Sequence, residues 1–260
     1  MSDGSVLFEV VNGTAIITLN RPSKLNALDR DLMAQLSKAF DQVEMNEAIS
    51  VTILTGSGRA FCAGGDIKDW GALTPREFGY SWVRQGHRLF DRLAQLRMPV
   101  IAALNGNALG GGFELAACAD IRIAGADIKV GLPETSIGVV PGWSGTQRLV
   151  KRFGYSAIAR MVLGGELFDA TEAKSLGLVD LIAEKSPVLD KAMEYAANIQ
   201  IRSQTANEIS KLMLLGAVAD GGDAAVEALG SILSAKTADR DEGVQAFSAK
   251  RIPYFKGHGL

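Results

Sequence analysis

The sequence is poor in the side chains from which metal sites and disulfide frameworks are built. Its 260 residues include only two cysteines and two histidines. Cys62 and Cys118 belong to no C-x-x-C pair and to no cluster of metal ligands, so we expect no disulfide and no metal site. We expect each to be a small buried side chain, in a reducing, cytoplasmic compartment.

The shortage of histidine also restricts the nucleophilic chemistry that is open to the chain. A Ser–His–Asp hydrolase would need His87 or His258, and the sequence has no G-x-S-x-G elbow to accompany either. His87 falls in a predicted helix, where a surface position is the simpler interpretation. The glycine pair Gly56 and Gly58 lacks the third glycine of a dinucleotide-binding fingerprint, because position 61 is Phe.

Charge and hydropathy disfavour further classes of protein. The net charge is −2 and no long basic run is present, so we expect no nucleic-acid partner. No apolar run reaches the roughly 20 residues of a membrane span. Residues 1–5 are neither basic nor followed by a long apolar segment, so we expect no secretory signal and no membrane association. The length and a hydrophobic fraction of 47% suit one large core with a helical appendage.

Strand and helix signals alternate along the first part of the chain. Asn12-Gly13 between two apolar runs predicts a hairpin of residues 7–11 and 15–19. Asp29 and Thr74 are predicted N-caps of helices that reach about Asn46 and Arg97. Further strands are predicted over 51–55, 100–104 and 121–124, and a short helix over 111–118. This alternation predicts a mainly parallel α/β fold with ligands at the carboxyl ends of the strands.

The remainder of the chain is predicted to be helical. Strand signals fade after about Val179, Pro187 opens a helix, and Asp239 with Glu242 forms the predicted cap of a last helix that runs to Lys250. We place a boundary near residue 190, between a core of residues 1–190 and a C-terminal helical region of residues 191–260. We expect this region to cover the core or to pack against another subunit.

Two of the predicted strands lead into glycine-rich turns, over residues 61–66 (FCAGGD) and 105–114 (NGNALGGGFE). Glycine permits positive φ and a close approach of the backbone to a ligand. Turns at neighbouring strand ends can direct two peptide N–H groups at one oxygen, the usual device for stabilising the oxyanion of an activated carbonyl. The alternative, that these glycines only permit tight turns, is disfavoured by finding two such turns, each after a β-branched strand.

Two glutamates accompany the turns. Glu114 lies just inside the second turn, and Glu134 follows twenty positions later, after Pro133. Taken singly, each also fits a first-turn acid that complements a helix dipole. Two carboxyl groups near one carbonyl, with pKa values separated by burial and mutual repulsion, can take up one proton and deliver another. Together with the two turns they suggest proton chemistry beside a thioester.

Several motifs together resemble the crotonase superfamily, and within it the enoyl-CoA hydratase/isomerase family. They are residues 19–22 (LNRP), 61–68 (FCAGGDIK), 110–114 (GGGFE), 133–134 (PE), 141–149 (PGWSGTQRL) and a tail over 240–253. The resemblance covers nearly the whole chain. It implies a spiral of ββα repeats with a C-terminal helical trimerisation region, and trimers that stack into hexamers. It also implies an acyl-CoA substrate, of which coenzyme A is a part, and oxyanion donors from the backbone N–H groups of Gly65 and Gly111.

Enoyl-CoA hydratases carry glutamates at both matching positions, so the resemblance favours hydration of a trans-2-enoyl-CoA to a 3-hydroxyacyl-CoA. Glu114 is predicted to orient and deprotonate the water, and Glu134 to deliver the α-proton. Double-bond isomerisation, or dehydration of a specialised hydroxyacyl-CoA, through the same enolate is the enzymatic alternative. A scaffold or RNA-binding homologue is disfavoured because both turns and both glutamates are present.

The resemblance further implies which residues contact coenzyme A and the acyl group. The segment along coenzyme A is Ala63, Asp66, Ile67 and Lys68. Lys24 and Lys250 match positions near the nucleotide end, although lysines are more often solvated surface residues.

The predicted acyl pocket includes Trp70, Pro141, Gly142 and Trp143. The two tryptophans depart from the small or flexible residues common at these positions. They either pack in the core or narrow the pocket, which would favour short, branched or cyclic acyl groups over long linear ones.

Overall fold

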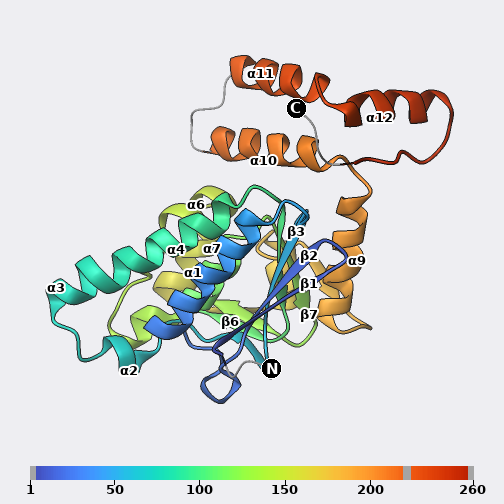
Figure 1. The fold of residues 1–260 in the computed structure, drawn as a ribbon. Helices are drawn as coiled ribbons and strands as arrows, with labels where there is room; N and C mark the ends of the chain where they lie inside the picture. The colour runs from blue at the N-terminus through green and yellow to red at the C-terminus, as the bar shows by residue number, and fades with distance from the viewer. Residues whose placement is uncertain (1–3, 219–223, 257–260) are drawn as a thin grey trace.

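Two β-sheets form the centre of the computed structural model, which describes residues 4–218 and 224–256 (Figure 1). The larger sheet has the strand order β1-β2-β3-β5-β7-β10, with β1 and β2 antiparallel and the other neighbours parallel. Its strands are β1 (Val6–Val11), β2 (Thr14–Leu19), β3 (Val51–Gly56), β5 (Val100–Leu104), β7 (Ile121–Gly125) and β10 (Leu181–Ala183). The mainly parallel sheet is as predicted.

The second sheet is smaller and carries the turns of interest. Its order is β4-β6-β8-β9, in which only β8 and β9 are antiparallel. The strands are β4 (Ala60–Cys62), β6 (Asn107–Leu109), β8 (Lys129–Gly131) and β9 (Leu167–Asp169). In each of the pairs β3/β4, β5/β6 and β7/β8, the first strand joins the large sheet and the second joins the small one. The predicted spiral of ββ units with intervening helices is therefore present.

Local sequence rules account for the first elements. Asn12 and Gly13, at φ 49° and 73°, make the turn of the predicted hairpin. Asp29 accepts a hydrogen bond from the Leu32 N–H at 2.8 Å and caps α1 (Arg30–Met45). Both predictions are confirmed.

The long helix predicted from Thr74 to Arg97 is three segments. Thr74 forms the predicted capping box, but α3 (Pro75–Glu77) passes into a π-helical segment, η2 (Phe78–Val83), before α4 (Arg84–Gln95) begins. Single π-helical turns inside helices occur frequently at functional sites. The widened turn changes which side chains of this stretch face inward, and three residues of η2 line the cavity described below.

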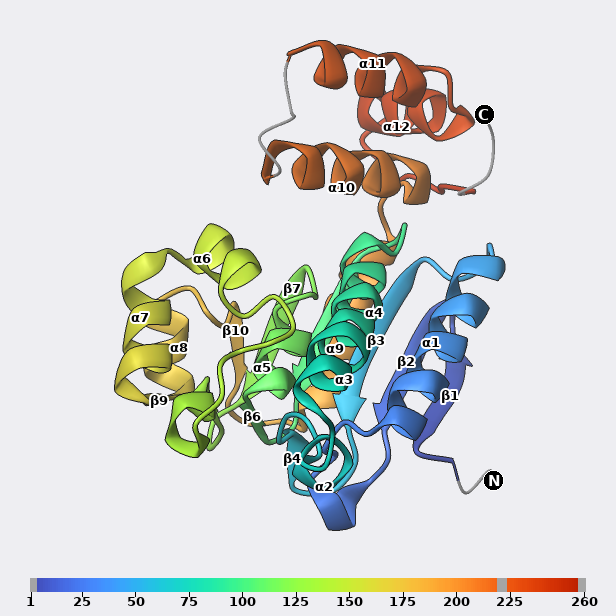
Figure 2. The same cartoon turned by 90° about the vertical axis from the view of Figure 1, so that its left-hand side faces the viewer.

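Helices cover both faces of the large sheet (Figure 2). On one face, α1 and α4 pack over the main core, where Leu32, Phe40 and Phe90 are fully buried. On the other face lies α9 (Val188–Gln200), whose Ala192 and Ala196 pack against β3, β5 and β7. Because α9 spans the predicted boundary near residue 190, the first helix of the C-terminal region packs as part of the core.

The remaining elements are helices and helical turns. They are η1 (Pro22–Lys24), α2 (Ile67–Trp70), α5 (Gly111–Ala116), η3 (Pro133–Ile137), α6 (Gln147–Phe153), α7 (Tyr155–Gly164), α8 (Ala170–Ser175), α10 (Gln204–Val218), α11 (Ala224–Ala235) and α12 (Ala238–Ser248). Helices α10–α12 stack beyond one end of the core (Figure 1). Buried Lys211 joins α10 to the core by an ion pair with Asp120 at 2.8 Å.

Two expectations for the end of the chain were wrong. A strand, β10, forms after Val179. Parallel pairing with β7 stabilises these three residues, whose own sequence does not predict a strand. The last helix is capped by Thr237, which accepts a hydrogen bond from the Arg240 N–H. Asp239 lies in the first turn instead, where it accepts hydrogen bonds from Ser203 Oγ and the Lys256 N–H.

Candidate active site

The two glycine turns meet where β4 and β6 pair. A Cβ placed on Gly64 would lie 3.2 Å from the nitrogen of Gly111, and one on Gly111 would lie 3.5 Å from the nitrogen of Gly65. The turns need glycine at Gly64 and Gly110, which have φ of 98° and 55°. Within the described residues, the Gly65 and Gly111 N–H groups have no hydrogen-bond acceptor. Two free donors are thus neighbours at one point of the surface.

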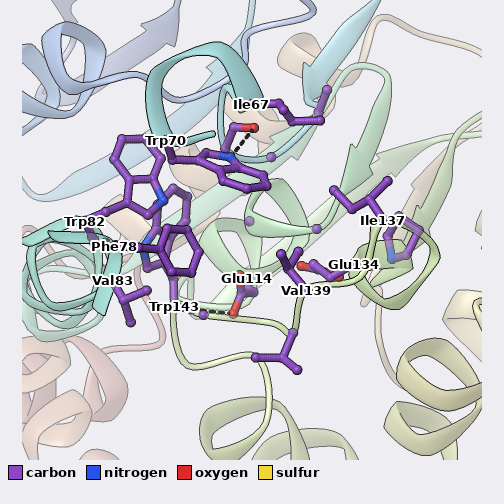
Figure 3. Close-up of a pocket in the computed structure, with 18 of the residues that line it drawn as sticks. Ile67, Trp70, Phe78, Trp82, Val83, Glu114, Glu134, Ile137, Val139 and Trp143 are labelled. Carbon is purple, nitrogen blue, oxygen red and sulfur yellow. Dashed lines mark hydrogen bonds between the residues drawn. The ribbon is translucent and has the colours of Figure 1, made fainter. Parts of the chain in front are cut away.

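A cavity of about 160 Å³ opens in front of these amides. Figure 3 shows aromatic side chains on one side, Glu134 and Ile137 on the other, and Glu114 between them. The cavity is lined by Ala63, Gly64, Gly65, Ile67, Trp70, Phe78, Trp82, Val83, Gly110, Gly111, Glu114, Pro133, Glu134, Ser136, Ile137, Val139, Val140, Gly142 and Trp143. Its polar groups are the two carboxyl groups, the Ser136 hydroxyl, the indole N–H groups of the tryptophans and the exposed backbone, and the rest of the lining is apolar.

Glu114 projects from α5 with only 2% of its surface exposed. Its Oε1 accepts hydrogen bonds from the N–H groups of Trp143 at 2.8 Å and Gly145 at 2.6 Å. Burial, and then the negative charge of Glu134, raise the pKa of Glu114 to about 8, while the two N–H donors and Arg148 oppose the shift. A carboxyl group in this state exchanges a proton near neutral pH.

Glu134 stands at the start of η3, after Pro133. Its Oε1 lies 3.1 Å from the point that a Cβ on Gly110 would occupy, and its Oε2 is buried without a hydrogen-bond partner. Burial raises the pKa of Glu134 to about 7, against the lowering effect of its own backbone N–H. An unpartnered buried oxygen that faces a cavity is available to a ligand.

Both carboxyl groups have pKa values raised to near neutral pH, and the charge of Glu134 contributes to the shift at Glu114. The higher pKa of Glu114 favours a proton there, whereas its two N–H donors favour the carboxylate. Coupled groups titrate as a pair, so the structure supports one shared proton near neutral pH rather than a fixed owner.

Three tryptophans converge on the first turn. A Cβ on Gly65 would lie 3.2–3.3 Å from the rings of Trp70, Trp82 and Trp143. Trp143 is 3% exposed, and the centroid of its ring lies 5.2 Å from that of Trp82 and 5.3 Å from that of Phe90. Trp143 therefore both belongs to the core and forms one wall of the cavity, so the two interpretations of this residue hold together.

The structure brings most of the predicted site residues together. Glu114, Glu134, Gly65 and Gly111 line the cavity, as do Ala63, Ile67, Trp70, Gly142 and Trp143. Pro141 is buried and is not among the residues that line the cavity.

The remaining predicted residues lie outside the cavity. Lys24, Lys68 and Lys250 are exposed, and the carboxyl group of Asp66 caps α2 and pairs with Arg21. Their predicted contacts with coenzyme A stay predictions.

Sequence reasoning missed part of the lining. Phe78, Trp82 and Val83 come from η2, and Val139 and Val140 from the loop after η3. The sequence signal for the first group was a pair of aromatic residues four positions apart, Phe78 and Trp82, in the helix predicted after Trp70. His87 was expected on the surface, but it is half-buried and hydrogen-bonded to Ser144, while His258 lies outside the described residues.

Comparisons with known proteins show which family the chain belongs to. The family model described as enoyl-CoA hydratase/isomerase matches residues 9–258. The chain belongs to this family. The family implies an acyl-CoA substrate.

Relatives of the enoyl-CoA hydratase/isomerase family match the chain over almost its whole length. The putative enoyl-CoA hydratase/isomerase YngF of Bacillus subtilis is 39% identical over an alignment of 259 residues that covers 97% of this chain and 98% of the relative. The 2,3-dehydroadipyl-CoA hydratase of Escherichia coli is 37% identical and covers 93% of this chain and 94% of its own. A crystal structure of enoyl-CoA hydratase from Bacillus anthracis has a TM-score of 0.89 at 32% identity, covering 98% of this chain and 100% of that one.

Two classes of feature are not found in the part of the chain that the structure describes. No group of three or more metal-ligating side chains occurs there. Nor does any of its helices have the length and apolarity needed to cross a bilayer.

Proposed function

We propose that this protein is an enoyl-CoA hydratase that adds water to a short, uncharged trans-2-enoyl-CoA. The observation that carries the proposal is the meeting of two unpaired backbone N–H groups and two carboxyl groups with raised pKa values around one small cavity. An isomerase needs one carboxyl group to move a proton between two carbons. Hydration moves two protons, one from water and one to carbon, and so makes use of both.

The reaction follows from the positions of these groups. The thioester oxygen accepts hydrogen bonds from the N–H groups of Gly65 and Gly111, which polarises the conjugated double bond. In the state that reacts, the proton of the pair is on Glu134 and Glu114 is the carboxylate. Glu114, held at Oε1, uses Oε2 to take a proton from water as the water oxygen bonds to Cβ of the substrate. The negative charge passes to the thioester oxygen as an enolate, and Glu134 then gives its proton to Cα. Each N–H donor is expected to contribute about 2.7–4 kcal/mol to this step.

The size of the cavity supports a short acyl group. At about 160 Å³ it is smaller than the roughly 300–1,000 Å³ typical of small-molecule sites, so coenzyme A lies outside it. Trp143 cannot turn away, because its ring packs so close to α4 that a Cβ on Gly86 would be 2.1 Å from Nε1. No cationic side chain is among the described lining residues, so a terminal carboxylate such as that of a dehydroadipyl group would be unpaired.

Ultraviolet absorbance of the conjugated thioester tests the proposal. Crotonyl-CoA is expected to lose absorbance as water adds, and the rate is expected to fall as straight acyl chains are lengthened or given a terminal carboxylate. E134Q, which cannot release a proton, is expected to lose at least about 100-fold in turnover. An absorbance gain with a 3-enoyl-CoA, and no loss with any 2-enoyl-CoA, would identify the isomerase alternative instead.

We also propose that the protein acts as a homotrimer or as a hexamer of stacked trimers. Large apolar side chains are exposed on the helices beyond the core, among them Leu212, Leu214, Leu229, Ile232 and Phe247. A protein–protein contact through these helices would cover such exposed apolar side chains. Light scattering after size exclusion tests the proposal, and a monomer at micromolar concentration would contradict it.

A further inference from the structure

Ser144 has an unusual backbone conformation for a residue with a side chain. Its φ is 81°, in the left-handed region that favours glycine. The residue is buried, in the loop between η3 and α6. Strained backbone of this kind persists only where the surroundings hold it, and it gathers at functional sites.

The conformation of Ser144 has a direct effect on Glu114. It turns the N–H groups of the residues on either side, Trp143 and Gly145, toward the same carboxyl oxygen. Backbone amides two residues apart that converge in this way form an anion-binding concavity. The fit is close, because a Cβ on Gly145 would lie 2.5 Å from Oε1 of Glu114. The left-handed turn therefore fixes both the position and the hydrogen bonding of the carboxyl group.

The turn at Ser144 contacts helix α4. Nδ1 of His87 lies 3.0 Å from Oγ of Ser144, within hydrogen-bond distance. The preceding residue, Gly86, provides the space in which the Trp143 ring lies. Gly86 of α4 thus packs against Trp143, and His87 is hydrogen-bonded to Ser144.

We propose that His87 is a positioning residue, which holds Ser144 in its left-handed conformation so that the loop amides keep Glu114 in place for the reaction. His87 touches neither the cavity nor Glu114, so it acts only through Ser144. The proposal rests on the proposed function for its activity measurements, whereas its conformational part can be tested without turnover.

Other charged groups around Glu114 come from three elements and are unchanged by the variants below. Glu134 faces it from η3, and Arg148 from α6 lowers its pKa. Arg148 itself pairs with Asp91 of α4 and donates to Cys118 of α5.

The test is a double-mutant cycle between His87 and Ser144. It uses S144G because glycine adopts positive φ without support from a neighbouring side chain. H87A and S144A are each expected to lower kcat/KM for crotonyl-CoA at pH 7 by about tenfold or more, the effect of weakened charged hydrogen bonds. Both should move the acid limb of the pH profile upward by about one pH unit, because a Glu114 with poorer donors binds its proton more tightly. In the S144G background, H87A should change kcat/KM less than about threefold.

Conservative replacement and thermal unfolding complete the experiment. H87N, whose side-chain amide reaches the place of Nδ1, is expected to keep both the rate and the pH profile. H87A should lower Tm by at least about 2 °C more in the Ser144 background than in S144G. Equal effects of H87A in the two backgrounds, or no effect in either, would overturn the proposal. If the wild-type protein hydrates no enoyl-CoA, the proposed function fails, and the Tm cycle still decides the role of His87.

Discussion

Replacing Glu114 with glutamine should make the protein more stable while it removes activity. Burial raises the pKa of Glu114 from an ordinary 4.5 to about 8, so the folded state keeps a proton that the unfolded chain releases above pH 4.5. Stability contributed by this group is therefore present at low pH and lost as pH rises from about 4.5 to 8. Over this range the free energy of unfolding falls by about 1.4 kcal/mol per pH unit, so the stability lost by pH 8 is roughly 2–5 kcal/mol.

Glutamine keeps the shape of the side chain and an oxygen that accepts from Trp143 and Gly145, but it carries no charge to bury. E114Q is expected to match the wild type near pH 5 and to exceed its Tm by about 5–15 °C at pH 8. Hydration of crotonyl-CoA should fall at least about 100-fold in the same preparation. Exposed Glu47 offers the control, because E47Q changes the same chemical group in solvent and should leave the pH dependence of Tm unaltered.

Thermal unfolding of the three proteins at pH 5, 6, 7 and 8 in buffers of equal ionic strength measures the difference directly. A stability advantage that is constant with pH would mean that glutamine packs better, not that a buried charge has been removed. An advantage that grows toward acid would show that the sign of the argument is wrong. Either result would refute the assignment of a raised pKa to Glu114.

Three further variants test other parts of the structure. W143A should cost about 3–5 kcal/mol of stability and raise the ratio of kcat/KM for medium over short acyl chains about tenfold; an unchanged ratio would exclude this ring as the size limit. K211M removes the ammonium that pairs with Asp120, whose carboxylate still accepts from the Val100 N–H, and should cost about 2–3 kcal/mol in urea unfolding. G112A places a Cβ 2.1 Å from a carbonyl oxygen of β4 and should cost at least about 3 kcal/mol, whereas G79A, in open space, should be neutral in the same assay.

Local rules allowed much of the fold to be predicted from the sequence. The Asn12-Gly13 turn and the caps at Asp29 and Thr74 form as expected, because each depends on a few consecutive residues. The same holds for the two glycine turns, where Gly64 and Gly110 have the positive φ that glycine permits. Where local signal was weak or ambiguous, prediction failed: β10 forms through pairing with β7, and the cap of α12 is Thr237 and not Asp239.

The chemical character of the site was decided by contacts between segments far apart in the chain. Nothing near Glu114 in the sequence indicates that residues 143–145 hold its carboxyl group, or that His87 on α4 in turn contacts that loop. The π-helical turn that brings Trp82 to the cavity is equally invisible in a helical pattern. The sequence determines which groups are available, since residue type and local turn geometry are written in neighbouring positions. Burial, shared protons and cavity size arise only when distant segments exclude water from the same small volume, and these the tertiary structure alone decides.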